Sequence, residues 1–227
     1  MTFCEKVRKK CDDIWEASFQ HPFITALADG TLPEEVFKYY VLQDSYYLQH
    51  FAKVHAMAAV QAKDLSTVQR FAQHADETCG AEILLHEGFF ELLGITDEDI
   101  ENFEPAPIAY AYTSHLYRVG LEGDLSATLS ALLPCYWLYY EIGERLKDAK
   151  PNHPIYDKWI ATYSSEWFEQ ATREQIDRLN KLTENLSKDR HKELESHFIK
   201  STHYELQFWE MAWTKQKWSL LIDEVNA

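Results

Sequence analysis

The chain has 227 residues, of which 46% are hydrophobic and 26% charged, and its formal charge is −15. This balance is typical of a globular protein with a sizeable core, and the negative charge disfavours binding to nucleic acid or to an anionic membrane surface. The first residues are charged and lack the apolar stretch of a signal peptide, and no segment is long and apolar enough to span a membrane. The four cysteines form no C-x-x-C pair, so they indicate free thiols in a cytoplasmic protein rather than a zinc site or a redox dithiol.

The hydrophobic pattern predicts an all-α fold, because apolar residues recur at helical spacing and no run alternates like a strand. Glycine and proline are scarce, with seven of each, which favours long helices over many turns. The predicted helices cover residues 3–19, 34–62, 65–93, 106–119, 125–149, 154–184 and 188–219, and a break near Ser164–Ser165 stays open. No linker or repeat divides them, so we expect a single-domain multi-helix bundle over residues 1–227.

Three stretches carry local signals. His21 is followed by Pro22, which predicts a helix start or a turn. The residues from Thr31 to Glu34 match the capping-box pattern and predict the start of the second helix. Residues 170–195 are dense in charge, which predicts a solvated helix face and a polar connection.

Three predicted helices each place one ionisable side chain on an otherwise apolar stripe. These side chains are Asp44 in helix 34–62, Cys135 in helix 125–149 and Glu205 in helix 188–219. A buried, unpaired carboxylate costs on the order of several kcal/mol, so such a group is paired, neutralised or kept for function. Structural hydrogen bonds and an inert core thiol explain these positions as well as a catalytic site does.

Tyrosines on inward stripes allow the same two interpretations. Tyr112 lies between Ile108 and Leu116, and Tyr163 follows Ile160 on its stripe. A core tyrosine needs a hydrogen-bond partner for its hydroxyl. These tyrosines therefore either connect helices or line a pocket for a flat, polar, small ligand.

Pro134 directly precedes Cys135 and leaves two geometries open. If the helix begins near residue 126, Pro134 frees the carbonyl of Ser130 and kinks the helix just before the thiol. If the helix begins at Pro134, Cys135 lies in its first turn, where the helix dipole lowers the pKa of a thiol.

Motifs for cofactors and metals are missing from the sequence. There is no nucleophile elbow, dinucleotide-binding loop or phosphate-binding loop, and no histidine has a glutamate three residues before it, as di-iron bundles require. The pairs Glu82–His86 and Glu193–His197 have i,i+4 spacing and are expected to be solvated helical pairs. His21 is the one tempting axial ligand for haem, and Pro22 argues against that role. We expect neither a metal nor a cofactor.

Five segments together resemble the TenA family, also called thiaminase II or aminopyrimidine aminohydrolase. They are spread from residue 18 to residue 209, and LQDSYY and LLPCYWLY are their most specific parts. The segments are SFQHPFITALADGTLPEEVFKYYVLQDSYYLQHFAKV, AYTSHLYR, ALLPCYWLYYEIGE, HPIYDKWIATY and YELQFW. The similarity is to the branch of the family that carries a cysteine at position 135.

This resemblance implies a haem-oxygenase-like bundle without haem, assembled as a homotetramer. It implies hydrolysis of 4-amino-5-aminomethyl-2-methylpyrimidine, and of thiamin, at the exocyclic methylene, which gives hydroxymethylpyrimidine for thiamin salvage. Cys135 would be the nucleophile and Glu205 the proton donor to the ring. Asp44, Tyr139 and Tyr163 would bind the aminopyrimidine, and Tyr47 and Tyr112 would orient or activate the thiol and the water.

Two other functions remain as alternatives on the same scaffold. A metal-dependent oxidase or oxygenase would need bound iron. A regulatory or binding protein would hold a pyrimidine or thiamin without turnover, and the Cys135–Glu205 pair weighs against it.

Overall fold

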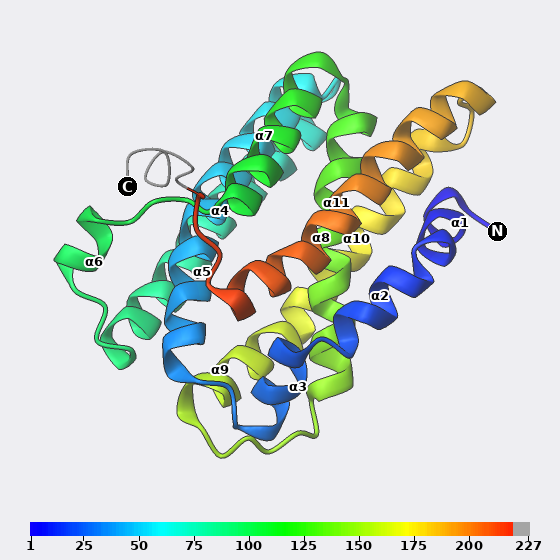
Figure 1. Cartoon of the computed structure of the whole chain (residues 1–227). Coiled ribbons are helices and arrows are strands. Elements are labelled where there is room, and N and C mark those ends of the chain that lie inside the picture. Colours follow the sequence, from blue (N-terminus) through cyan, green and yellow to red (C-terminus); the bar gives the residue numbers. More distant parts are fainter. Residues whose placement is uncertain (220–227) are drawn as a thin grey trace, which may run out of the picture.

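The computed structural model describes residues 1–219, without the side chains of residues 78, 79 and 81–87. Within that range the chain is built from helices and contains no strand, which confirms the predicted all-α class. The helices are α1 (Phe3–Lys10), α2 (Asp12–Phe19), α3 (Pro22–Asp29), α4 (Glu34–Gln61), α5 (Leu65–Leu92), α6 (Asp97–Glu101), α7 (Pro107–Glu122), α8 (Leu125–Leu146), α9 (Pro154–Tyr163), α10 (Glu166–Thr183) and α11 (Lys188–Thr214). Helices α1 and α2 lie along one side of the bundle, and α6 projects from the opposite side (Figure 1).

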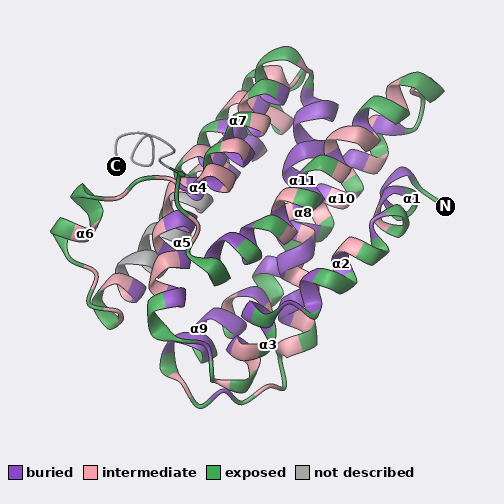
Figure 2. Ribbon diagram, in the orientation of Figure 1, coloured by how far each residue is buried: buried purple, intermediate pink, exposed green. Residues whose placement is uncertain are grey.

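Helix α8 forms the centre of the bundle. Residues 125–134 are buried at every position, and Figure 2 shows that burial continues along most of the helix. Helix α8 packs against α7, α9, α10 and α11, while α4 packs against α5 and α7. A side chain on the inner faces of these helices is therefore held by neighbours on several sides.

Gly143 brings α8 and the end of α9 into direct contact. A Cβ atom at position 143 would lie 2.4 Å from the carbonyl oxygen of Tyr163, closer than non-bonded atoms approach. Glycine therefore lets the backbone of Tyr163 pack on α8, one turn after Tyr139. The rings of Tyr139 and Tyr163 then lie 4.7 Å apart between centroids.

Helix α8 begins well before Pro134. Asp124 caps it by accepting a hydrogen bond of 3.1 Å from the amide of Ala127. Pro134 therefore lies inside the helix and has no N–H to donate to the carbonyl of Ser130, as in the first of the two geometries considered. Because Cys135 lies in mid-helix, the dipole of a helix N-terminus does not activate its thiol.

The N-terminal region contains more helices than the sequence pattern predicts. The single helix expected over residues 3–19 is divided at Cys11, which ends α1 and begins α2. Helix α3 was not predicted as an element, although a helix start or a turn was expected at His21 and Pro22. His21 caps α3, and the Nδ1 atom of His21 accepts a hydrogen bond of 3.2 Å from the amide of Phe23. The buried side chain of Cys11 and the short lengths of these helices hide the boundaries from a periodicity argument.

The capping box expected at Thr31 is wrong. Pro33 is the N-cap residue of α4, and no side chain caps this end. The amides of Thr31 and Leu32 instead donate to the carbonyl of Ala26, at 2.8 and 3.1 Å, and so close the end of α3. Thr31 thus belongs to the preceding helix terminus rather than to the following one.

The break near Ser164–Ser165 is confirmed. Helix α9 ends at Tyr163, and Ser165 caps α10 by accepting from the amide of Phe168 at 3.2 Å.

The last helix ends at Thr214 instead of residue 219, since Lys215 adopts a left-handed conformation with φ of 49°. The short α6 was not predicted.

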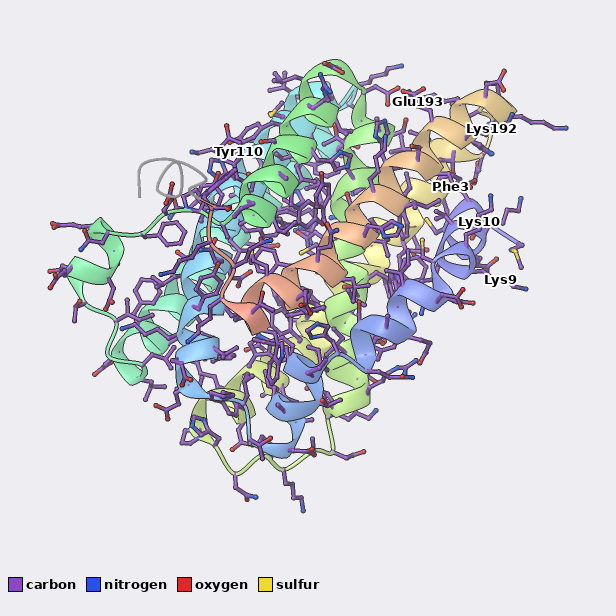
Figure 3. All side chains as sticks on the ribbon, in the orientation of Figure 1. Phe3, Lys9, Lys10, Tyr110, Lys192 and Glu193 are labelled. Atoms are coloured by element: carbon purple, nitrogen blue, oxygen red, sulfur yellow. The ribbon has the colours of Figure 1, made fainter. Side chains whose placement is uncertain are left out.

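Residues 170–195 present a charged, solvated face, as predicted, but some of their polar side chains are buried. Lys192 and Glu193 are exposed near the outer end of α11 (Figure 3), and Glu193 lies 3.9 Å from His197 as a partly solvated pair. On α10, however, Gln175 is fully buried and faces α5. The predicted pair Glu82–His86 lies outside the described side chains.

Candidate active site

A pocket with a cavity volume of about 40 Å³ opens between α4, α5, α8, α9 and α10. Its lining side chains are Asp44, Leu48, Phe51, His74, Glu77, Cys135, Tyr136, Tyr139, Tyr163, Trp167, Phe168 and Ala171. Four of the seven residues predicted for the site are among them. The remaining three, Glu205, Tyr112 and Tyr47, lie in the buried interior next to Cys135.

Glu205 contacts the thiol directly. Its carboxyl group is 2% exposed, it is hydrogen-bonded to the Cys135 side chain, and it accepts a hydrogen bond of 2.5 Å from the hydroxyl of Tyr112. Burial raises the pKa of Glu205 to about 8, and the charge of Asp44 adds to the rise, while the hydrogen bonds from Tyr112 and Cys135 oppose it. A carboxyl group with this pKa can both accept and donate a proton near neutral pH.

Tyr47 and Tyr112 enclose the thiol and the carboxyl group. Their ring centroids are 4.9 Å apart, and both side chains are buried. Burial, with the nearby charges of Cys135 and Glu205 as further causes, raises the pKa of each phenol well above its ordinary value. Both phenols therefore stay neutral, and Tyr112 uses its hydroxyl to donate to Glu205.

Asp44 and the pocket tyrosines form the other wall. Asp44 is 5% exposed, and its charge contributes to the raised pKa of Tyr139, after burial and Tyr40. The hydroxyl groups of Tyr139 and Tyr40 are 3.1 Å apart, and Trp159 Nε1 donates to Tyr40 at 3.4 Å. With Tyr163 packed on Tyr139, the pocket offers aromatic faces around a buried carboxylate.

Several residues that line the pocket, or that support its lining as Tyr40 supports Tyr139, were not predicted. Tyr40 lies on the same stripe as Asp44, one turn earlier, and that spacing could have found it. Trp167 and Phe168 follow the helix break at Ser164–Ser165, which could have marked a pocket edge. His74 and Glu77 had no comparable signal, because α5 is mixed in polarity along its length.

The described side chains contain no group of three or more His, Cys, Asp or Glu residues placed to hold a metal ion. His21, the candidate axial ligand, caps α3, and its Nε2 lies 3.1 Å from Glu210. Among the described residues, no helix has the length and apolar character needed to cross a membrane.

Structural comparison defines the class of fold. A domain of unknown function with a heme oxygenase-like fold from Shewanella denitrificans OS217 matches with a TM-score of 0.72 at 19% identity, covering 93% of this chain and 92% of the other. The predicted haem-oxygenase-like bundle is therefore confirmed.

The sequence comparison then gives the family. The model of the TENA/THI-4/PQQC family matches residues 8–215, and the chain belongs to this family. A Bacillus subtilis (strain 168) protein named aminopyrimidine aminohydrolase is 52% identical over 219 residues, which cover 96% of this chain and 93% of that protein. The TenA homologue protein from P. horikoshii OT3 matches with a TM-score of 0.84 at 32% identity, covering 94% of this chain and 99% of the other. The predicted resemblance is confirmed.

The raised pKa of Glu205 predicts a pH-dependent stability. The folded state keeps a proton that the unfolded chain releases above its ordinary pKa of 4.5, so the free energy of unfolding falls as the pH rises from 4.5 to about 8. Glu205→Gln removes this dependence. We therefore compare the free energy of unfolding of the variant with that of the wild type, measured in urea. As the pH rises from about 5 to about 8.5, this difference should shift in favour of the variant by on the order of a few kcal/mol.

Glu193→Gln provides the control, because Glu193 is exposed near the start of the same helix. A stability difference between Glu205→Gln and the wild type that stays constant over this pH range would contradict the raised pKa.

Proposed function

We propose that this chain is an aminopyrimidine aminohydrolase (thiaminase II). It cleaves the C–N bond at the exocyclic methylene of 4-amino-5-aminomethyl-2-methylpyrimidine, and of thiamin, and the product 4-amino-5-hydroxymethyl-2-methylpyrimidine enters thiamin salvage. The contact between Cys135 and the buried Glu205, at the base of an aromatic pocket, carries the proposal. The name of the Bacillus subtilis relative supports it.

In this proposal Asp44 and the tyrosines bind the pyrimidine. The ring lies against Tyr139 and Tyr163, because its faces are apolar and the pocket walls are aromatic. Asp44 accepts a hydrogen bond from the exocyclic amine at the ring edge, which offsets the cost of burying its charge.

The chemistry needs a nucleophile, because the methylene group does not release an amine while the ring is aromatic. Glu205 takes the proton from Cys135, and the thiolate Sγ forms a bond to a ring carbon. Glu205 then delivers that proton to the ring nitrogen that receives the electron pair displaced by the attack. The ring is no longer aromatic, so it can supply an electron pair that forms a double bond to the methylene carbon. The C–N bond breaks, and its electron pair leaves with the amine. Water adds to the methylene carbon and releases one proton to solvent. Glu205 takes back the proton from the ring nitrogen, and the C–S bond breaks with its electron pair leaving on sulfur, which restores the aromatic ring.

Tyr112 and Tyr47 support these steps. Tyr112 donates to Glu205 Oε1 at 2.5 Å, so it holds the carboxyl group in place against the thiol. Tyr47 is buried beside Cys135 and Tyr112, where a neutral phenol orients the thiol and the attacking water. These are positioning roles, since both groups stay protonated throughout.

Cys135→Ser tests the covalent route. The wild type should convert 4-amino-5-aminomethyl-2-methylpyrimidine into the hydroxymethyl product, detected by chromatography. The serine variant should lose at least about a thousandfold in kcat, because an alcohol is a much poorer nucleophile than a thiolate at neutral pH. Its thermal unfolding and its affinity for the product should stay close to those of the wild type. Near-normal turnover by a folded serine variant contradicts the cysteine adduct, and binding without turnover by the wild type favours the non-catalytic alternative.

Asp44→Ala and Glu205→Gln separate binding from proton transfer. Loss of the hydrogen bond to Asp44 should weaken hydroxymethylpyrimidine binding by about ten- to more than a hundredfold, or roughly 1.5–3 kcal/mol. Glu205→Gln should lower kcat far more than product affinity, because proton transfer matters mainly in the transition state. Calorimetric titration of the product into each variant measures the difference. Unchanged affinity in folded Asp44→Ala makes Asp44 a structural carboxylate.

We propose further that residues 1–227 act as one cytoplasmic catalytic domain that assembles as a homotetramer. The described cysteines Cys4, Cys11 and Cys135 are free thiols, as expected in a reducing compartment. Val60, Leu65 and Leu121 are 87%, 86% and 75% exposed. They lie at the end of α4, the start of α5 and the end of α7, and Gln61 at the end of α4 donates to the carbonyl of Gly120 near the end of α7. Exposed apolar side chains gathered in this way are typical of a protein interface.

The tetramer can be measured by sedimentation velocity. At micromolar concentration we expect the mass of four chains of 26.6 kDa each. The mass of a single chain under these conditions would show that the tetramer is wrong.

A further inference from the structure

The pocket is lined by a second carboxylate that the proposed reaction does not use. Glu77 of α5 has a side chain that is 36% exposed, whereas Asp44 is 5% exposed. Asp44 therefore lies at the buried end of the pocket and Glu77 at its opening. The pocket therefore has a carboxylate at each end, and aromatic rings make up much of the remaining lining.

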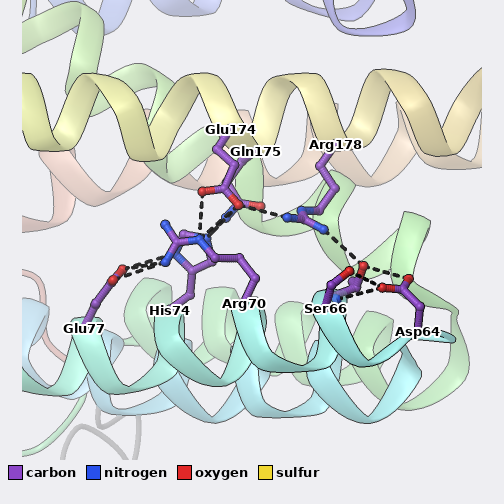
Figure 4. Close-up of polar contacts among 9 residues, drawn as sticks. Asp64, Ser66, Arg70, His74, Glu77, Glu174, Gln175 and Arg178 are labelled. Carbon is purple, nitrogen blue, oxygen red and sulfur yellow. Dashed lines mark hydrogen bonds and ion pairs between the residues drawn. The ribbon is translucent and has the colours of Figure 1, made fainter.

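Glu77 lies at one end of a row of charged groups between α5 and α10, shown in Figure 4. Arg70 Nη1 lies 3.1 Å from Glu77 Oε1, and Arg70 Nε donates to Glu174 Oε2 at 2.8 Å. Arg178 Nη2 also donates to Glu174, at 2.9 Å. The two guanidinium groups are thus shared with two carboxylates, and Arg70 and Arg178 do not line the pocket themselves.

His74 lines the pocket beside Glu77 and does not supply a positive charge. It is 2% exposed, and its Nε2 lies 2.6 Å from Gln175 Nε2. Burial, followed by the charges of Arg70 and Arg178, lowers the pKa of His74 to about 3. The ring is therefore neutral, and the pocket lining contains carboxylates but no cationic side chain.

Trp167 lines the same pocket from the first turn of α10. Its indole is 47% exposed, which is unusual for a tryptophan that contacts a pocket. An exposed aromatic face together with a carboxylate is a favourable environment for an organic cation, since the ring and the carboxylate both attract positive charge.

We propose that Glu77 and Trp167 form a subsite at the pocket opening for the positively charged leaving group of the substrate. The inference rests on the proposed function. The aminomethyl group is an ammonium ion at neutral pH and the thiazolium ring of thiamin carries a permanent charge, whereas the hydroxymethyl product is neutral. With the pyrimidine edge at Asp44, the leaving group points toward the opening, through which it departs.

Calorimetric titrations in a Cys135→Ser background test the subsite without turnover. Glu77→Gln keeps a hydrogen-bonding partner for Arg70 but removes the charge at the pocket. We expect it to weaken the binding of 4-amino-5-aminomethyl-2-methylpyrimidine and of thiamin by about five- to tenfold. The affinity for neutral hydroxymethylpyrimidine should change by less than about twofold. Trp167→Leu should act in the same direction.

Glu174→Gln is the matched control, because Glu174 binds the same Arg70 and does not line the pocket. It should not separate the cationic ligands from the neutral product. An equal loss of affinity for all three ligands in Glu77→Gln, or the same selective loss in Glu174→Gln, overturns the subsite. If the wild type fails to hydrolyse either substrate, the proposed function fails, while the titrations still decide whether Glu77 selects cations.

Discussion

The burial of the Glu205 carboxyl group beside the Cys135 thiol is the constraint on which the rest of the site depends. A carboxylate at this depth loses its hydration, and the raised pKa of about 8 is the consequence of that loss. Tyr112 compensates in part with a short hydrogen bond. Three helices must therefore meet at one point: α8 brings the thiol, α11 the carboxyl group and α7 the phenol. Burying this carboxyl group costs free energy of desolvation, and the packing of a large core offsets that cost.

The architecture of α8 explains how the thiol becomes accessible without leaving that core. The helix is buried throughout its first ten residues, and Cys135 is the first position after them that is partly exposed. Pro134 removes one backbone hydrogen bond just before it, and Gly143 allows α9 to close against the same helix two turns later. The pocket wall is thus built on the central helix rather than on a loop, so its groups are held with little freedom. Cys135 lies ten residues after the start of α8, so the N-terminus of its own helix does not act on the thiol, and the proposed activation falls to Glu205.

The sequence located the buried polar side chains of the candidate site better than it located the helix boundaries. A polar residue on an apolar stripe is conspicuous, because the helical period fixes the face on which it lies; this is how Asp44, Cys135 and Glu205 were found. Gln175 and Glu174 escaped notice because they lie in a charge-dense helix, where an inward-facing polar group looks the same as a solvated one. Helices α3 and α6 are too short to show a period. The wrong capping box shows the same limit. The residue types from Thr31 to Glu34 match the capping-box pattern, but the amides of Thr31 and Leu32 bind the end of the preceding helix, α3.

The distribution of charge in the pocket also bears on the direction of the proposed reaction. A cationic substrate is attracted to a pocket that is acidic at both ends, in a chain whose formal charge is −15. In the proposed reaction, the pyrimidine product would keep its contacts with Asp44 and the tyrosines but would lack the positive charge that Glu77 would hold. With the proposed subsite, the enzyme would bind the substrate through one more interaction than the product, and the product would be released more easily than the substrate. Glu77 at the pocket opening would then select for the charged leaving group, while Asp44 at the buried end would recognise the pyrimidine ring that remains in the product.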